Sequence, residues 1–151
     1  MIRDDIKAAL VNAMKSGDKT GTAAIRLIQA AIKNRDIELR TASQQPDDDL
    51  LVTEVLQKMI KQRRESIEMY DKGGRQELAD AEKAEVTVIE RFLPQQMSDA
   101  EATAAINAIV AEIGATSVKD MGKVMAALKE RHAGQIDMSK ASGLVKGALA
   151  S

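Results

Sequence analysis

Apolar residues recur along this chain at the spacing of an α-helix, and nowhere do they alternate as in a β-strand. Near the start, apolar side chains return every four residues from Ile2 to Met14, and Ser16-Gly17 follows as a helix end. Similar stretches follow, separated by glycine, proline or consecutive aspartates. The pattern predicts helices at about 2–16, 20–40, 50–71, 76–92, 99–113, 118–132 and 139–150.

A proline separates the fourth expected helix from the fifth. The fourth must end before Pro94, because proline cannot continue a helix. Ser98, with Glu101 three residues later, forms a capping box that starts the next one. We therefore expect an all-α protein in two parts: an N-terminal helical bundle of about four helices over residues 1–94 and a smaller C-terminal three-helix domain over residues 95–151.

Two charged residues fall on the apolar faces of the third and fourth expected helices. On helical wheels, Arg63 lies in the middle of one face and Glu85 at the centre of the other, with Glu82 at its edge. The apolar residues of that second face are Leu78, Ala81, Val88, Ile89 and Phe92. A lone charge on a core face is costly, so we expect a structural ion pair between Arg63 and Glu85. If the pair is fully buried, removing one partner costs roughly 3–5 kcal/mol. The alternative is that Arg63 lines a groove and binds a phosphate.

The composition argues against several kinds of site. The chain has no cysteine and one histidine, His132, which excludes disulfides, thiolate chemistry and multi-histidine metal sites. Three consecutive aspartates, 47–49, suit the positively polarised start of the following helix better than a metal. No phosphate-binding loop or nucleophile elbow is present. We therefore expect no catalytic constellation, no metal and no cofactor.

The first residues are charged and lack the apolar core of a signal peptide. No apolar stretch approaches the roughly 20 residues that span a bilayer. These features predict a cytoplasmic protein without membrane contact.

Charge is balanced overall, with 22 basic and 23 acidic side chains, but it is unevenly spread. Lys19, Arg26, Lys33 and Arg40 recur every seven residues opposite the apolar face of the second helix. Such a ridge can follow a phosphate backbone, or it is simply a solvated face. With two aromatic residues in the chain, base stacking is nearly excluded, and any RNA contact would use backbone and shape.

The string Asp120-Met121-Gly122-Lys123-Val124-Met125 is the most distinctive local feature. A glycine this early in a helix costs about 1 kcal/mol relative to alanine. We therefore expect either another helix or a ligand to approach the backbone at Gly122. Lys123 follows, near helix amides that favour anions.

Four strings resemble the YqeY family in order and spacing along essentially the whole chain. They are Lys61-Gln62-Arg63-Arg64-Glu65-Ser66, Gly74-Arg75-Gln76-Glu77-Leu78-Ala79, Phe92-Leu93-Pro94 and the Asp120–Met125 string. The resemblance implies that the C-terminal part is similar to the tail domain of the B subunit of glutamyl/aspartyl-tRNA amidotransferase. That enzyme converts misacylated Glu-tRNA(Gln) or Asp-tRNA(Asn) to the amide, and its tail domain engages tRNA. The cradle domain that performs its chemistry has no counterpart here.

The sequence departs from the family pattern around Gly134, where lysines flank the glycine in the family and Ala133 and Gln135 stand here. Losing two cations weakens an electrostatic RNA site. The remaining candidates for contact with tRNA or a partner are Gly122, Lys123, Lys129, Arg131, Gly134, Lys140 and Lys146.

Three functions follow from these observations. The leading one is a non-catalytic module that binds tRNA or a tRNA-handling protein complex. The second is a protein–protein adaptor that uses a groove between the two parts and has no RNA contact. The third is a contribution to carbon–nitrogen ligase activity, with glutamine as amido donor, within a complex.

Overall fold

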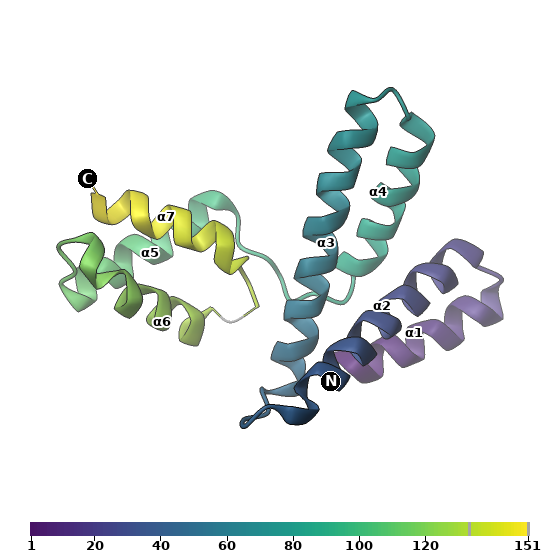
Figure 1. The fold of residues 1–151 in the computed structure, drawn as a ribbon, viewed down its shortest axis with the longest axis horizontal. Helices are drawn as coiled ribbons and strands as arrows, with labels where there is room; N and C mark the ends of the chain where they lie inside the picture. Colours follow the sequence, from purple (N-terminus) through teal and green to yellow (C-terminus); the bar gives the residue numbers. More distant parts are fainter. Residues whose placement is uncertain (133, 151) are drawn as a thin grey trace. The chain divides into compact units, whose positions relative to one another are not determined.

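The computed structural model describes residues 1–132 and 134–150, and within these ranges the chain is all-α, as predicted, with no strand. Figure 1 labels the α-helices, which are α1 (Ile2–Ser16), α2 (Lys19–Glu38), α3 (Asp48–Lys72), α4 (Gln76–Glu90), α5 (Asp99–Ile113), α6 (Met121–Arg131) and α7 (Met138–Ala150). Two 3-10 turns lie between them, η1 (Leu39–Thr41) after α2 and η2 (Val118–Asp120) before α6. The helix expected over 118–132 thus begins with a separate 3-10 turn.

The chain divides into two compact units, one over Met1–Leu93 and a second that begins at Pro94. The division lies one residue before the boundary that the sequence predicts. Each unit has its own apolar core. In the first unit every helix contributes a side chain that is at most 1% exposed: Ile6, Ile28, Leu56 and Ile89. In the second unit the residues buried to the same extent include Ile106, Ile109, Val124, Leu128 and Val145.

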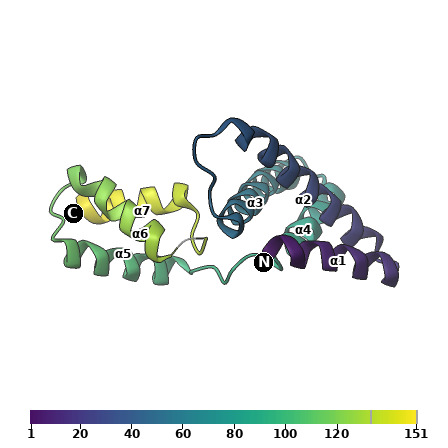
Figure 2. The same cartoon turned by 90° about the horizontal axis from the view of Figure 1, so that it is seen from below.

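The first unit consists of two antiparallel helical hairpins, α1–α2 and α3–α4 (Figures 1 and 2). Each hairpin turns at a glycine with positive φ, Gly17 at 74° and Gly74 at 70°, a conformation that side chains disfavour. The first half of α3 is buried against the other helices, whereas no residue of 61–72 is fully buried. Figure 1 shows the loop end of the α3–α4 hairpin extending past α1 and α2.

This overhang corrects the apolar face predicted for the fourth helix. Leu78 is 42% exposed and Ala81 is also exposed, although both were expected to be covered. Ala79 and Val86 are buried instead. Near the hairpin loop α4 has only α3 beside it, so the side of α4 that a third helix would cover faces solvent. A wheel cannot show how many neighbours a helix has at each turn.

Arg3 joins three helices of the first unit. From α1 its guanidinium donates to Asp36 of α2 at 2.9 Å and to Asp48 at the start of α3 at 2.8 Å. The neighbouring aspartates complete the junction. Asp49 accepts the backbone N–H of Ile2 at 2.9 Å, and Asp47 caps α3. All three consecutive aspartates therefore serve helix ends, in line with the expected role at the start of α3.

The contact predicted between Arg63 and Glu85 is present. Arg63 Nε donates to Glu85 Oε2 at 2.8 Å, and Arg63 Nη1 donates to the carbonyl of Met59 at 3.3 Å. The side chains are 15% and 29% exposed, so the pair is only partly buried. The charges lie where the second half of α3 meets α4, and each satisfies the other on an otherwise apolar face.

The second unit is a bundle in which α5, α6 and α7 each contact the other two. The Ser98 hydroxyl accepts the N–H of Glu101 and the Glu101 carboxylate accepts the N–H of Ser98, which is the predicted capping box. Met97 N–H donates to the carbonyl of Gln135 at 2.8 Å. The segment after Pro94 is thereby attached to the turn that precedes α7.

Glu85→Ala should lower the free energy of unfolding by about 2 kcal/mol, because Arg63 would keep a partly buried, unpaired charge. The figure is below that for a fully buried pair since water still reaches both side chains. Urea unfolding of the full chain measures it. Glu65→Ala, at an exposed carboxylate of α3, is the matched control. Equal stability of the two variants would show that the pair has no structural role.

The Arg3 junction should also make stability depend on pH. The hydrogen bond from Arg3 lowers the pKa of Asp36 in the folded protein. An aspartate in an unfolded chain has a pKa of about 4, so at pH values near and below 4 the unfolded protein binds more protons at Asp36 than the folded protein does. The free energy of unfolding therefore falls as pH decreases. Asp36→Asn should therefore be less stable than wild type at about pH 6, and this difference should shrink at about pH 3. A difference that stays constant over this range would contradict the prediction.

Candidate nucleic-acid interface

Helix α6 has a core face and an outer face that differ sharply in chemistry. Val124 and Leu128 point into the core and are fully buried. The segment before α6 is held by Asp120, whose carboxylate accepts the N–H of Thr116 at 3.1 Å. The outer face carries Gly122, Lys123, Ala126 and Lys129, all of them exposed. At 100° per residue the two lysines lie on either side of the two small residues.

Gly122 has open space around it. A Cβ placed there would meet no atom within 4 Å, and the residue is exposed. Close packing against another helix, one of the two explanations offered by the sequence, is therefore excluded within the described part of the unit. The other explanation, a ligand or partner that approaches the backbone, remains.

Two further glycines, Gly143 and Gly147 on α7, share these properties, and the sequence analysis missed them. Both lie inside a helix, both are exposed, and an added Cβ would meet nothing within 4 Å at either. Lys140 and Lys146 are exposed on the same helix. The available signal was two glycines within a predicted helix, each of which costs about 1 kcal/mol relative to alanine.

The structure separates the candidate cations into two groups. Arg131 makes a bidentate contact with Glu112, at 2.7 and 2.8 Å, which lowers the pKa of that carboxyl group. Lys140 pairs with Asp99. Both pairs connect helices of the second unit and so have a structural explanation. Within the described residues, Lys123, Lys129 and Lys146 are exposed and have neither a hydrogen-bond partner nor an ion-pair partner.

Gly134 occupies a different position from the other candidates. It is buried, has a φ of 77°, and its carbonyl accepts a hydrogen bond from Gln96 Nε2 at 2.6 Å. Its conformation explains the glycine without a ligand. Ala133, where the family pattern has a lysine, lies outside the described residues. Gln135 is half-buried, and its side chain contacts His132 Nδ1 at 3.2 Å.

The described residues contain no group of three or more His, Cys, Asp or Glu side chains that could hold a metal ion. Among the same residues, no helix combines the length and the apolar character needed to cross a bilayer.

A family model described as Yqey-like protein matches residues 3–149. The chain belongs to the YqeY family. Among curated proteins it is similar to Altered inheritance of mitochondria protein 41, mitochondrial, of Eremothecium gossypii, with 34% identity over 88 residues, which cover 58% of this chain and 46% of the relative. The protein of the same name in Lachancea thermotolerans is 30% identical over 111 residues, which cover 72% of this chain and 58% of the relative. An uncharacterized protein of Schizosaccharomyces pombe is 32% identical over 95 residues, which cover 62% and 73% of the two chains.

These matches span about half the length of the first two relatives, so what the whole relatives do is not carried over to this YqeY-family chain. Their names contradict the prediction of a cytoplasmic protein, because they place the relatives in mitochondria. That prediction was wrong in its reasoning as well. The charge and hydropathy of a few residues test for a secretory signal peptide and do not distinguish compartments inside the cell.

If Gly122 is present for an external contact rather than for packing, Gly122→Ala should stabilise the protein by about 0.5–1 kcal/mol. The added methyl group meets open space, and the unfolded chain loses conformational freedom. Thermal unfolding of the full chain measures the change. A lower melting temperature would contradict this interpretation and would show that the fold itself requires glycine at this position.

Proposed function

We propose that the protein is a non-catalytic helical module that binds tRNA through the outer face of α6, with a further contact from Lys146 of α7. The single observation that carries this proposal is the arrangement on α6. Lys123 and Lys129 lie exposed and unpaired within the described residues, on either side of an exposed surface formed by Gly122 and Ala126. Small residues let a backbone come close, and the flanking ammonium groups are placed to neutralise its phosphates.

The type of contact follows from the chemistry available. The second unit contains no tryptophan or tyrosine, and the one phenylalanine of the chain precedes it. Stacking on unpaired bases is therefore not the means of binding. Lysines contacting phosphates give affinity that depends on salt and little on base sequence. Such a surface suits the folded backbone of tRNA, whose shape rather than sequence is recognised.

A resemblance inferred from the sequence supports the same proposal. The similarity of the second unit's motifs to the tail domain of the tRNA amidotransferase B subunit is the reason for proposing tRNA rather than another nucleic acid. The missing lysines at the turn before α7 shift the expected contact toward α6. Lys123, Lys129 and Lys146 then supply the contacts, while Arg131 and Lys140 hold the bundle together.

A titration of labelled total tRNA with the full chain at two ionic strengths tests the proposal. Lys123→Ala and Lys129→Ala should each weaken binding and reduce the salt slope by about one, and the double variant by about two. Lys61→Ala, at an exposed lysine of α3 in the first unit that also has no ion-pair partner among the described residues, is the matched control and should leave both quantities unchanged. Absence of tRNA binding at low ionic strength would overturn the proposal. Binding that is insensitive to both lysines would place the site elsewhere.

A further inference from the structure

Helix α2 carries apolar residues on two opposite sides. Its core side buries Ile25, Ile28 and Ile32. The solvent side carries an outer stripe, which recurs at alternating spacings of four and three residues and consists of Ala23, Leu27, Ala30, Asn34 and Ile37. All five residues are exposed, Leu27 to 46% and Ile37 to 45%. A helix on the surface of a single domain needs one apolar face only, and this 4–3 spacing is the one that packs against a second helix.

One flank of the outer stripe is positively charged. Lys19, Arg26 and Lys33 of α2 and Arg40 of η1 are exposed, and none has a hydrogen-bond or ion-pair partner within the described residues. The nearby carboxylates are engaged elsewhere, since Asp36 binds Arg3 and Glu38 binds Arg35. The ridge predicted from the sequence is therefore a row of cations without a close ion-pair partner among the described residues, although the charge of Arg40 contributes to lowering the pKa of Asp36. If the outer stripe is taken as the two apolar positions of a heptad, the ridge lies at one of the flanking positions. Charged residues at these flanking positions determine which partner helix is bound.

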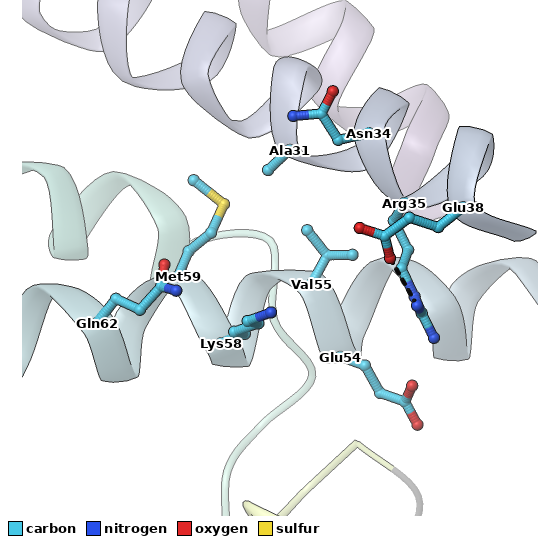
Figure 3. A pocket seen from close by; sticks show the side chains of 9 residues that line it. All are labelled: Ala31, Asn34, Arg35, Glu38, Glu54, Val55, Lys58, Met59 and Gln62. Atoms are coloured by element: carbon cyan, nitrogen blue, oxygen red, sulfur yellow. Dashed lines mark hydrogen bonds and ion pairs between the residues drawn. The ribbon is translucent and has the colours of Figure 1, made fainter.

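The other flank opens into a groove between α2 and α3 with a volume of about 470 Å³. Figure 3 shows Ala31 from α2 and Val55 and Met59 from α3 facing one another across it. Its polar edge is formed by Asn34, Arg35, Glu38, Glu54, Lys58 and Gln62. The groove thus has a small apolar floor beneath a polar edge, and it adjoins the outer stripe. An apolar stripe beside a groove is a form in which an amphipathic helix is bound.

We propose that the outer stripe and the α2–α3 groove bind an amphipathic helix of another protein, whose apolar face is flanked by acidic residues. The apolar side chains of this helix would lie on Leu27 and Ile37 and enter the groove. Its carboxylates would pair with the ridge at Arg26 and Lys33. This surface lies on the first unit, so the inference goes beyond tRNA binding by the second.

Charge complementarity distinguishes this occupant from two others. A second copy of the chain would bring its own ridge against Arg26 and Lys33, and such like-charge contacts oppose pairing. An RNA backbone would match the cations but would leave Leu27, Ile37 and the apolar groove floor uncovered. An acidic amphipathic helix satisfies both the apolar and the charged parts of the surface.

Two synthetic helical peptides of about three heptads, with identical leucine positions, test the proposal on the full chain. One carries glutamate on both flanks of its apolar face and the other carries lysine. Fluorescence anisotropy at low ionic strength should show the glutamate peptide binding at least about tenfold more tightly. Leu27→Glu should weaken it by about tenfold or more, and the double variant Arg26→Glu/Lys33→Glu should reverse the preference between the peptides.

Met69→Glu, at a methionine of α3 that is 73% exposed, is the control and should leave peptide binding unchanged. Helical content by circular dichroism verifies that each variant is folded.

Equal affinity for the two peptides, or binding that Leu27→Glu does not affect, would overturn the proposal. A wild-type dimer in sedimentation that Leu27→Glu dissociates would identify a second copy as the occupant. Loss of tRNA affinity in Arg26→Glu/Lys33→Glu without any effect on the peptides would assign the ridge to RNA. The peptide measurements do not depend on Lys123 and Lys129, so tRNA binding by the second unit is tested separately.

Discussion

One guanidinium group joins three helices of the first unit. Arg3 lies on α1, and its hydrogen bonds to Asp36 and Asp48 connect the end of α2 and the start of α3. A planar donor with several N–H groups can satisfy two carboxylates at once, which a lysine could not do in the same geometry. These pairs bring three helix ends together, while the burial of Ile25, Ile28 and Ile32 in the core sets the rotation of α2 about its own axis. The same rotation determines which side chains of α2 face solvent.

That rotation also determines which charges of α2 reach the surface. Because Asp36 is engaged with Arg3 and Glu38 with Arg35, no carboxylate of α2 remains to neutralise Arg26 and Lys33. The structural ion pairs thus leave a positive ridge beside the apolar outer stripe. The carboxylates that hold the helices together form ion pairs inside the first unit, so they do not pair with the cations of the ridge. In the proposed binding site, stability and binding are connected in this way.

The second unit allocates its charges in the same way. Arg131 and Lys140 connect helices through Glu112 and Asp99, and the cations left over among the described residues are Lys119 of η2 and the lysines on the outer faces of α6 and α7. The exposed glycines of these helices fit this division, because they weaken the helix without improving any contact inside the unit. In the two proposals made here, the second unit of this YqeY-family chain binds an anionic backbone and the first unit binds an acidic helix. Together the proposals describe a chain that connects tRNA to a protein partner.

The sequence by itself determined the features that depend on near neighbours along the chain. Helix periodicity, the capping box of Ser98 and Glu101 and the helix end at Gly17 were all predictable, because each rests on contacts within about four residues. The facing of Arg63 and Glu85 was also predictable, since a charge in the middle of an apolar face requires an opposite charge on the helix beside it.

Only the tertiary structure decided how the helices rotate and which charges meet. The exposure of Leu78, the open space at Gly122 and the Arg3 junction depend on which helices lie side by side at each turn, and a wheel drawn for one helix contains no such information. Arg131 and Lys123 look equivalent in the sequence. They differ in the structure because Glu112, 19 residues before Arg131, lies within hydrogen-bond distance of its guanidinium, and no carboxylate among the described residues does so for Lys123. Long-range pairing of this kind follows from the three-dimensional packing of the cores, and it determines which cations remain available for a ligand.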